Sequence, residues 1–92
     1  MRLRARGMID TLDSPARAGS DFADNLLNEN IDWIDLTIQV TGIPSTVLTS
    51  AFWDGFTNQM LKEAPLLFPD VQKVVWICDH DFQEDMINEH LR

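Results

Sequence analysis

The fold of this chain is decided by residues 42–56, which read GIPSTVLTSAFWDGF. Pro44 cannot lie inside a helix that comes from before it, but its fixed backbone angle suits a first helical turn. Ser45 and Thr46 carry short hydroxyl side chains, which accept hydrogen bonds from the free N–H groups of a helix start. The stretch therefore predicts that an extended segment ends, turns, and becomes a helix that begins at Ser45.

The apolar residues of this helix recur at the spacing of one helical face, which must be buried. They are Val47, Leu48, Ala51, Phe52, Gly55 and Phe56. Trp53 lies opposite the centre of that face and close in angle to Met60, so the two predict a second apolar strip. Exposed Trp and Met are typical contact residues, and we interpret both as partner-binding. The sequence leaves open that residues 66–68 or the N-terminal segment cover them.

Two apolar segments flank the helix and predict parallel strands. In residues 33–40 the even-numbered positions are apolar and the odd-numbered ones from Asp35 are polar, which indicates a sheet with one polar face. Residues 71–78 are almost continuously apolar, which is typical of an interior strand. A strand, a helix and a strand form a βαβ unit. The turns at residues 42–46 and 79–81 should therefore meet at the C-terminal edge of the sheet, where open α/β sheets usually place their sites.

The rest of the chain predicts shorter elements within one domain, residues 1–92. Residues 1–6 alternate apolar side chains with arginines and predict a strand, and residues 10–19 predict a loop. A helix should begin at Ser20 or Asp21 and end near residues 28–30. The helix from Ser45 should end near residue 63, before Pro65. The expected fold class is α/β: a small mixed sheet with a βαβ unit and helices mainly on one face.

Composition and charge limit the classes of function. The chain has 92 residues, 45% of them hydrophobic, and a formal net charge of −8. Nucleic-acid binding needs clustered Lys and Arg, so we expect no nucleic acid as a partner. No apolar run approaches the roughly 20 residues of a membrane helix, and the N-terminus lacks the apolar stretch of a signal peptide. We therefore expect a cytoplasmic protein with no membrane partner.

One cluster of chemically active side chains stands out after the last strand. Cys78, Asp79, His80 and Asp81, with Glu84 nearby, bring a thiol, an imidazole and carboxylates together. Adjacent residues point in different directions at a strand end, and no second ligand pair has a recognised spacing. We expect no metal, no cofactor and no catalysis here, with Cys78 a buried small hydrophobe.

Elsewhere in the chain, the sequence spacings indicate no nucleophile–base pair and no phosphate-binding glycine loop. Asp81, with Glu84 three residues later, predicts the start of a last helix. His90 is interpreted only as a residue near the C-terminus of that helix, where a partial positive charge is favourable. The sequence therefore favours a binding and regulatory module over an enzyme.

A family resemblance sharpens this hypothesis. Residues 42–48, followed by Ala51 and Phe52, resemble the Gly-aromatic-Pro-Ser-Ser-Phe-Leu-x-x-Ala-Phe signature of the STAS-like domains of unknown function in bacteria and mobile elements. Residues 19–22 resemble that family's Ser-Gly-Glu-Glu-Phe helix start, and the resemblance covers residues 16–91. In the related anti-anti-sigma domains, an Asp-Ser-Ser-Gly-Leu turn opens the central helix, and a kinase-like ATPase phosphorylates its first serine.

The resemblance implies specific residues. Ser45 matches the phosphorylated serine, Thr46 the second serine and Leu48 the leucine, while Pro44 replaces the acidic residue and Val47 the glycine. It implies a non-enzymatic module, switched by phosphorylation at Ser45 or Thr46, that binds a kinase-like ATPase. The βαβ order places the expected partner contact at the C-terminal edge of the sheet, through Gly42, Pro44, Asp79 and His80. A plain helix cap explains Ser45 with fewer assumptions than a phosphorylation switch, and a homodimer is left open.

The acidic charge supports an alternative from another class. The chain could be an inhibitor from a phage or another mobile element that binds a host defence or nucleic-acid-binding protein by imitating nucleic-acid charge. The residues that would carry this charge are Asp79, Asp81, Glu84, Asp85 and Glu89. Salt separates the two hypotheses, because a charge mimic loses its partner steeply as ionic strength rises.

Overall fold

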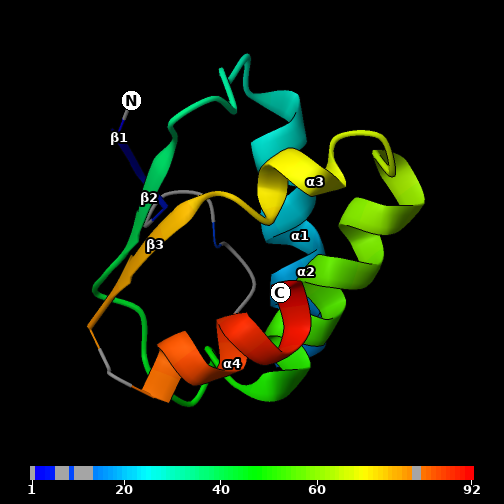
Figure 1. Ribbon diagram of the computed structural model, residues 1–92. Helices are drawn as coiled ribbons and strands as arrows, with labels where there is room; N and C mark the ends of the chain where they lie inside the picture. Colours follow the sequence, from blue (N-terminus) through cyan, green and yellow to red (C-terminus); the bar gives the residue numbers. More distant parts are fainter. Residues whose placement is uncertain (1, 6–8, 10–13, 80–81) are drawn as a thin grey trace.

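The computed structural model describes residues 2–5, 9, 14–79 and 82–92. In these residues a parallel sheet with the strand order β1-β2-β3 packs against helices (Figure 1). The strands are β1 (Arg2–Arg4), β2 (Thr37–Val40) and β3 (Val75–Cys78), and the helices are α1 (Pro15–Asn28), α2 (Ser50–Glu63), α3 (Phe68–Val71) and α4 (Phe82–Leu91). The α/β class is confirmed. The expectation of a mixed sheet is wrong, because both strand pairings are parallel.

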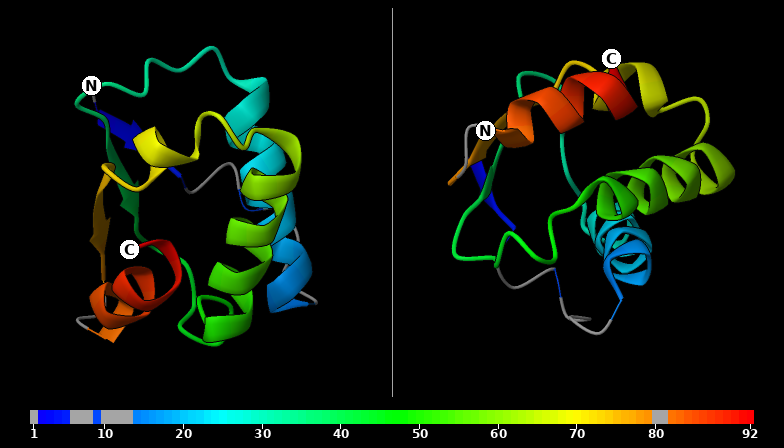
Figure 2. Two further views of the ribbon diagram at one scale, coloured as in Figure 1. Left: turned by 45° about the vertical axis from the view of Figure 1, so that its right-hand side comes forward. Right: turned by 90° about the horizontal axis from the view of Figure 1, so that it is seen from below.

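The helices gather on one side of the sheet (Figures 1 and 2). From β1 to β2 and from β2 to β3, the chain moves one strand over in the same direction. Successive crossovers of the same hand then place their helices on the same face, and crossovers between parallel strands almost always share one hand. Among the described residues, no helix covers the other face of the sheet (Figure 1).

The register of β2 explains its alternating pattern. Ile38 pairs with Leu3 and Trp76 and is fully buried on the helix side. Thr37 pairs with Arg2 and Val75 on the open face, where Arg2 is exposed and Val75 is 55% exposed. The predicted polar face of the sheet is therefore present.

The strands predicted for residues 33–40 and 71–78 both begin later in the structure, at Thr37 and Val75. β2 begins at Thr37, because Asp32 Oδ1 accepts a hydrogen bond from the Ile34 N–H at 3.0 Å and Asp35 takes a left-handed conformation with φ of 54°. Ile34 is consequently 71% exposed. β3 lies at an edge of the described sheet, so the prediction of an interior strand is wrong. The predicted apolar run is longer than β3 because its first residue, Val71, is the buried last residue of α3.

The helix starts also differ from the prediction. α1 begins at Pro15, with Ser14 as its N-cap accepting from the Arg17 N–H at 3.5 Å, so residues 15–19 are helix and not loop. α2 begins at Ser50, not Ser45. The Pro44 carbonyl accepts from the N–H groups of Val47 and Leu48, and Thr49 is extended and serves as the N-cap. The predicted helix ends at residues 28–30 and near residue 63 are confirmed.

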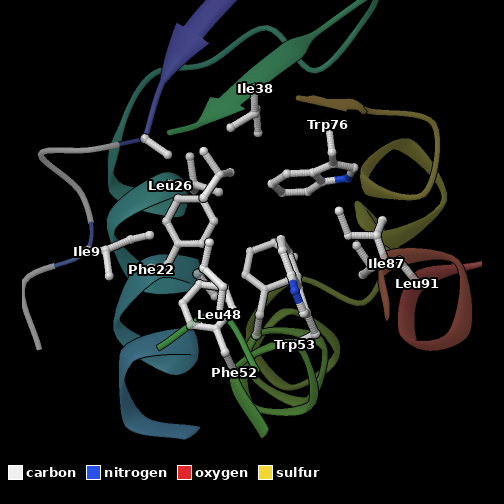
Figure 3. Packing of buried hydrophobic residues seen from close by; sticks show 14 of the residues in the cluster. Ile9, Phe22, Leu26, Ile38, Leu48, Phe52, Trp53, Trp76, Ile87 and Leu91 are labelled. Atoms are coloured by element: carbon white, nitrogen blue, oxygen red, sulfur yellow. The ribbon is translucent and has the colours of Figure 1, made fainter. Parts of the chain in front are cut away.

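The core lies between the sheet and the helices and is built around aromatic rings (Figure 3). Phe22 of α1 packs against Phe52 and Phe56 of α2, with ring centroids 5.9 and 5.3 Å apart. Trp76 of β3 meets Trp53 edge-on at 5.2 Å. Edge-on and offset pairs are favourable for aromatic rings, so this cluster joins the sheet to both long helices.

α1 and α2 approach each other at two glycines. A methyl group on Gly19 would collide with the Phe52 carbonyl oxygen, and one on Gly55 would collide with the carbonyl oxygen of Ala16. The Ser20 hydroxyl donates to the Gly55 carbonyl at 3.4 Å. Contact between the two backbones therefore requires glycine at both positions.

Candidate functional site

The C-terminal ends of β2 and β3 lie side by side, with Val40 paired to Cys78. Just beyond them, the Gly42 N–H donates to Asp79 Oδ2 at 2.7 Å. Gly42 has φ of 73°, which favours glycine because a side chain would be strained there. The prediction that the segments after the two strands meet at this edge is confirmed for Gly42 and Asp79. His80 and Asp81 lie outside the described residues.

The turn after Gly42 presents its polar side chains to solvent. Pro44, Ser45 and Thr46 are exposed, while Val47 and Leu48 are buried. Because α2 begins only at Ser50, the interpretation of Ser45 and Thr46 as helix-capping residues is wrong. Both hydroxyls are nevertheless accessible on the same edge as Asp79.

Trp53 and Met60 do not form an exposed contact strip. Both are fully buried. The Trp53 indole Nε1–H donates to Gln83 Oε1 at 3.0 Å, and the ring lies in the aromatic cluster (Figure 3). α2 packs against α1 and α4, so more than one of its faces is covered. The prediction that these two residues bind a partner is therefore wrong.

Gln83 is a buried polar residue that the sequence analysis missed. It is fully buried, and its Nε2 donates to the Leu48 carbonyl at 2.8 Å while its Oε1 accepts from Trp53. Gln83 thus ties α4 to the turn that leads into α2. The available signal was its spacing, because Gln83 precedes Ile87 by four positions and shares the buried stripe of α4 with Leu91.

A second cluster lies where α4 packs against the first turns of α2. The Ser50 hydroxyl lies 2.8 Å from His90 Nε2, and His90 Nδ1 lies 2.9 Å from Asp54 Oδ1. The His90 side chain is 12% exposed, whereas that of Asp54 is 65% exposed. The Thr57 hydroxyl also donates to the His90 carbonyl at 3.5 Å, which holds the end of α4 against α2.

This arrangement corrects the expectation that the chain has no nucleophile–base pair. A serine hydroxyl, an imidazole and a carboxylate form one hydrogen-bonded line, which is the order that activates a serine in hydrolases. Ser50 and Asp54 are one helical turn apart, which the sequence shows. Nothing in the sequence indicates that His90 of α4 reaches between them.

Cys78 is half-buried, and burial raises the pKa of its thiol to about 11, with smaller contributions from the charges of Asp79 and Glu84. A raised pKa keeps the thiol protonated, which opposes both metal binding and nucleophilic attack. Among the described residues, no group of three or more His, Cys, Asp or Glu side chains is placed to hold a metal ion.

Acidic side chains face solvent along α4 and the turn before it. Asp79, Glu84, Asp85 and Glu89 are all exposed, and Asp81 lies outside the described residues.

In the described part of the chain, every helix is too short or too polar to cross a bilayer.

Comparison of the chain with family models, with curated proteins and with solved structures gave no match.

Proposed function

We propose that this protein is a regulatory module that works by contact with another protein, and that this contact is centred on residues 42–46. The observation that carries the proposal is the exposed turn of Pro44, Ser45 and Thr46, anchored to the end of β3 by the Gly42–Asp79 hydrogen bond. A surface loop fixed on a rigid frame loses little conformational freedom when it binds, which favours its use in recognition.

The resemblance to STAS-like domains adds a regulatory element to this proposal. In it, Ser45 or Thr46 accepts a phosphate from a kinase-like ATPase partner, and both hydroxyls are exposed. Because α2 begins at Ser50, the phosphate acts through its charge and not by capping the helix. It adds about −1.5 to −2 charges to the exposed turn after Gly42, which would repel an acidic partner surface and attract a basic one.

The experiment is an affinity capture from host cells with three forms of the tagged protein. They are the natural chain, the double variant Ser45→Arg with Thr46→Arg, and the control Glu29→Arg with Asn30→Arg. The control residues are also exposed but follow α1 at the opposite end of the molecule (Figure 1). We expect one partner that the natural chain and the control capture and the double variant loses.

Two outcomes would count against parts of the proposal. A partner that all three forms capture equally would overturn residues 42–46 as the contact. Mass spectrometry of the captured natural chain tests the switch separately. A kinase-like ATPase could copurify while Ser45 and Thr46 carry no phosphate and gain none when ATP is supplied. That result would contradict the phosphorylation switch but not the protein contact.

The exposed carboxylates of α4 favour a second candidate function. In this proposal the protein is an acidic inhibitor whose Asp79, Glu84, Asp85 and Glu89 bind the basic surface of a defence or nucleic-acid-binding protein. Such a complex should weaken steeply between 50 and 500 mM salt, and the variant Glu84→Gln with Asp85→Asn and Glu89→Gln should abolish it. A partner that is insensitive to both changes would exclude charge mimicry.

A further inference from the structure

The Ser50–His90–Asp54 line has an order of hydrogen bonds that activates a nucleophile. A carboxylate oxygen only accepts hydrogen bonds, so a neutral His90 bonded to Asp54 carries its proton on Nδ1. Its Nε2 is then an acceptor, and the Ser50 hydroxyl, 2.8 Å away, is the donor. We propose that this line is a reactive serine centre that transfers the acyl group of an activated ester to water, an activity beyond the protein contact proposed above.

Burial and packing fix the imidazole in place. The His90 side chain is 12% exposed, and two side chains of α2 bind its two ring nitrogens. Ser50 itself is exposed, so a substrate can approach the hydroxyl from solvent without opening the fold. The rigid base and the accessible nucleophile are the two properties that general-base activation of serine requires.

The position of Ser50 at the start of α2 favours stabilisation of the negative charge that develops on the carbonyl oxygen during the reaction. Ser50 is the first residue of this helix, with Thr49 as N-cap. The first N–H groups of a helix have no carbonyl partner within it, and the helix dipole places partial positive charge there. In the proposal, the N–H groups of Ser50 and Ala51 are the donors for the carbonyl oxygen of an acyl group attached to Ser50.

The proposed reaction needs only the ester and water. Ser50 Oγ bonds to the carbonyl carbon while His90 Nε2 takes the hydroxyl proton, and the ester C–O bond then breaks as His90 returns that proton to the leaving alcohol. Water next attacks the acyl-serine, giving a proton to His90. The acid leaves when the acyl bond to Ser50 breaks and His90 reprotonates Oγ, so no oxidant or other reactant is consumed.

The exposure of Asp54 sets the expected size of the effects. Water screens a carboxylate that is 65% exposed, so its support of the imidazole is weaker than that of a buried acid. We expect Asp54→Asn to lower the rate only about fivefold. His90→Gln removes the base and should lower the rate by about 100-fold or more, and Ser50→Ala should abolish acylation.

The test uses the full chain with a fluorophosphonate probe and with p-nitrophenyl acetate. The probe reacts by loss of fluoride as a serine oxygen bonds to phosphorus, and peptide mapping identifies the modified residue. We expect labelling at Ser50 and an acetyl-Ser50 intermediate with the ester. The matched control is Ser20→Ala, since Ser20 contacts Gly55 and no part of the cluster. Circular dichroism checks that each variant is folded.

If the probe labels the natural chain no more than Ser50→Ala, the proposal is overturned. The three residues then only hold α4 against α2. Ester hydrolysis that persists in Ser50→Ala would also overturn the proposal, because His90 or a surface group would then be responsible. A second measurement does not depend on ester recognition. Ser50→Cys should react with iodoacetamide at pH 7 at least about tenfold faster than Ser45→Cys, which is also exposed, because an adjacent imidazole promotes the thiolate. Equal rates would contradict activation by His90.

Discussion

At the scale of single residues, the turn that leads into α2 is held by a buried pair, Trp53 and Gln83. Gln83 accepts from the Trp53 indole and donates to the Leu48 carbonyl, so the buried amide is satisfied at both ends. Satisfied polar groups cost little in a core, whereas an unpaired one costs roughly 1–3 kcal/mol. The pair therefore fixes how α4 meets α2, and with it the position of His90 beside Ser50.

We predict that Trp53→Ala destabilises the fold by about 3–5 kcal/mol, because it removes a fully buried ring and leaves Gln83 Oε1 without its donor. Urea denaturation followed by circular dichroism measures the loss. Trp33→Ala is the matched control and should cost less, since Trp33 is only partly buried. A Trp53→Ala protein of natural stability would contradict the buried position.

The thiol of Cys78 gives a prediction of pH dependence. Its pKa is raised from 9.0 to about 11 in the folded state. The folded chain therefore keeps a proton that the unfolded chain releases, so this contribution to stability is present below pH 9 and is lost as pH rises through 11. We expect Cys78→Ser to lose less stability between pH 8 and pH 11 than the natural chain. Equal losses in both proteins would show that the thiol does not contribute.

Between elements, the contact of α1 with α2 depends on small residues. Gly19 is buried against the backbone of α2, and Gly55 lies against Ala16 of α1. Because the obstacles are backbone carbonyls, a side-chain rotation cannot relieve a clash at either position. This close approach brings Phe22 onto Phe52 and Phe56.

We predict that Gly19→Ala and Gly55→Ala each cost about 3 kcal/mol or more, although alanine is the better helix former by roughly 1 kcal/mol. Thermal denaturation of each variant measures the change. Arg17→Ala is the control, because Arg17 is exposed on α1 and its loss should change little. If either glycine variant were more stable than the natural chain, helix propensity would outweigh packing and the close approach would be wrong.

At the scale of the whole molecule, a net charge of −8 acts on a small fold in which no helix of the described part covers the second face of the sheet (Figure 1). The exposed arginines of β1 lie on this face, while the carboxylates of α4 face solvent on the other side of the sheet. A chain with this excess of carboxylates repels itself in the compact state, and dissolved ions screen that repulsion.

We therefore predict that the melting temperature rises as sodium chloride increases from 10 to 200 mM. Differential scanning calorimetry at pH 7 measures the change, and the variant Glu84→Gln with Asp85→Asn should show a smaller rise because it carries less charge. A melting temperature that falls with added salt would indicate that ion pairs outweigh the repulsion.

Local patterns in the sequence determined the features that depend on neighbours along the chain. The alternation around Ile38 set the buried face of β2, Pro65 set the end of α2, and the order of strand, helix and strand indicated parallel strands. These features depend on backbone geometry and periodicity, which short segments carry by themselves. Membership of the STAS-like family and phosphorylation of Ser45 stay predictions.

The tertiary structure decided which surfaces meet, and that decided the candidate sites. Periodicity shows that Trp53 lies off the main apolar face of its helix, but only the packing of α4 shows that this second face is covered. α2 begins at Ser50 because Thr49 is extended, and His90 near the end of α4 lies between Ser50 and Asp54. Such contacts join residues that are far apart in sequence, and they form because the whole core packs together, so no single segment encodes them.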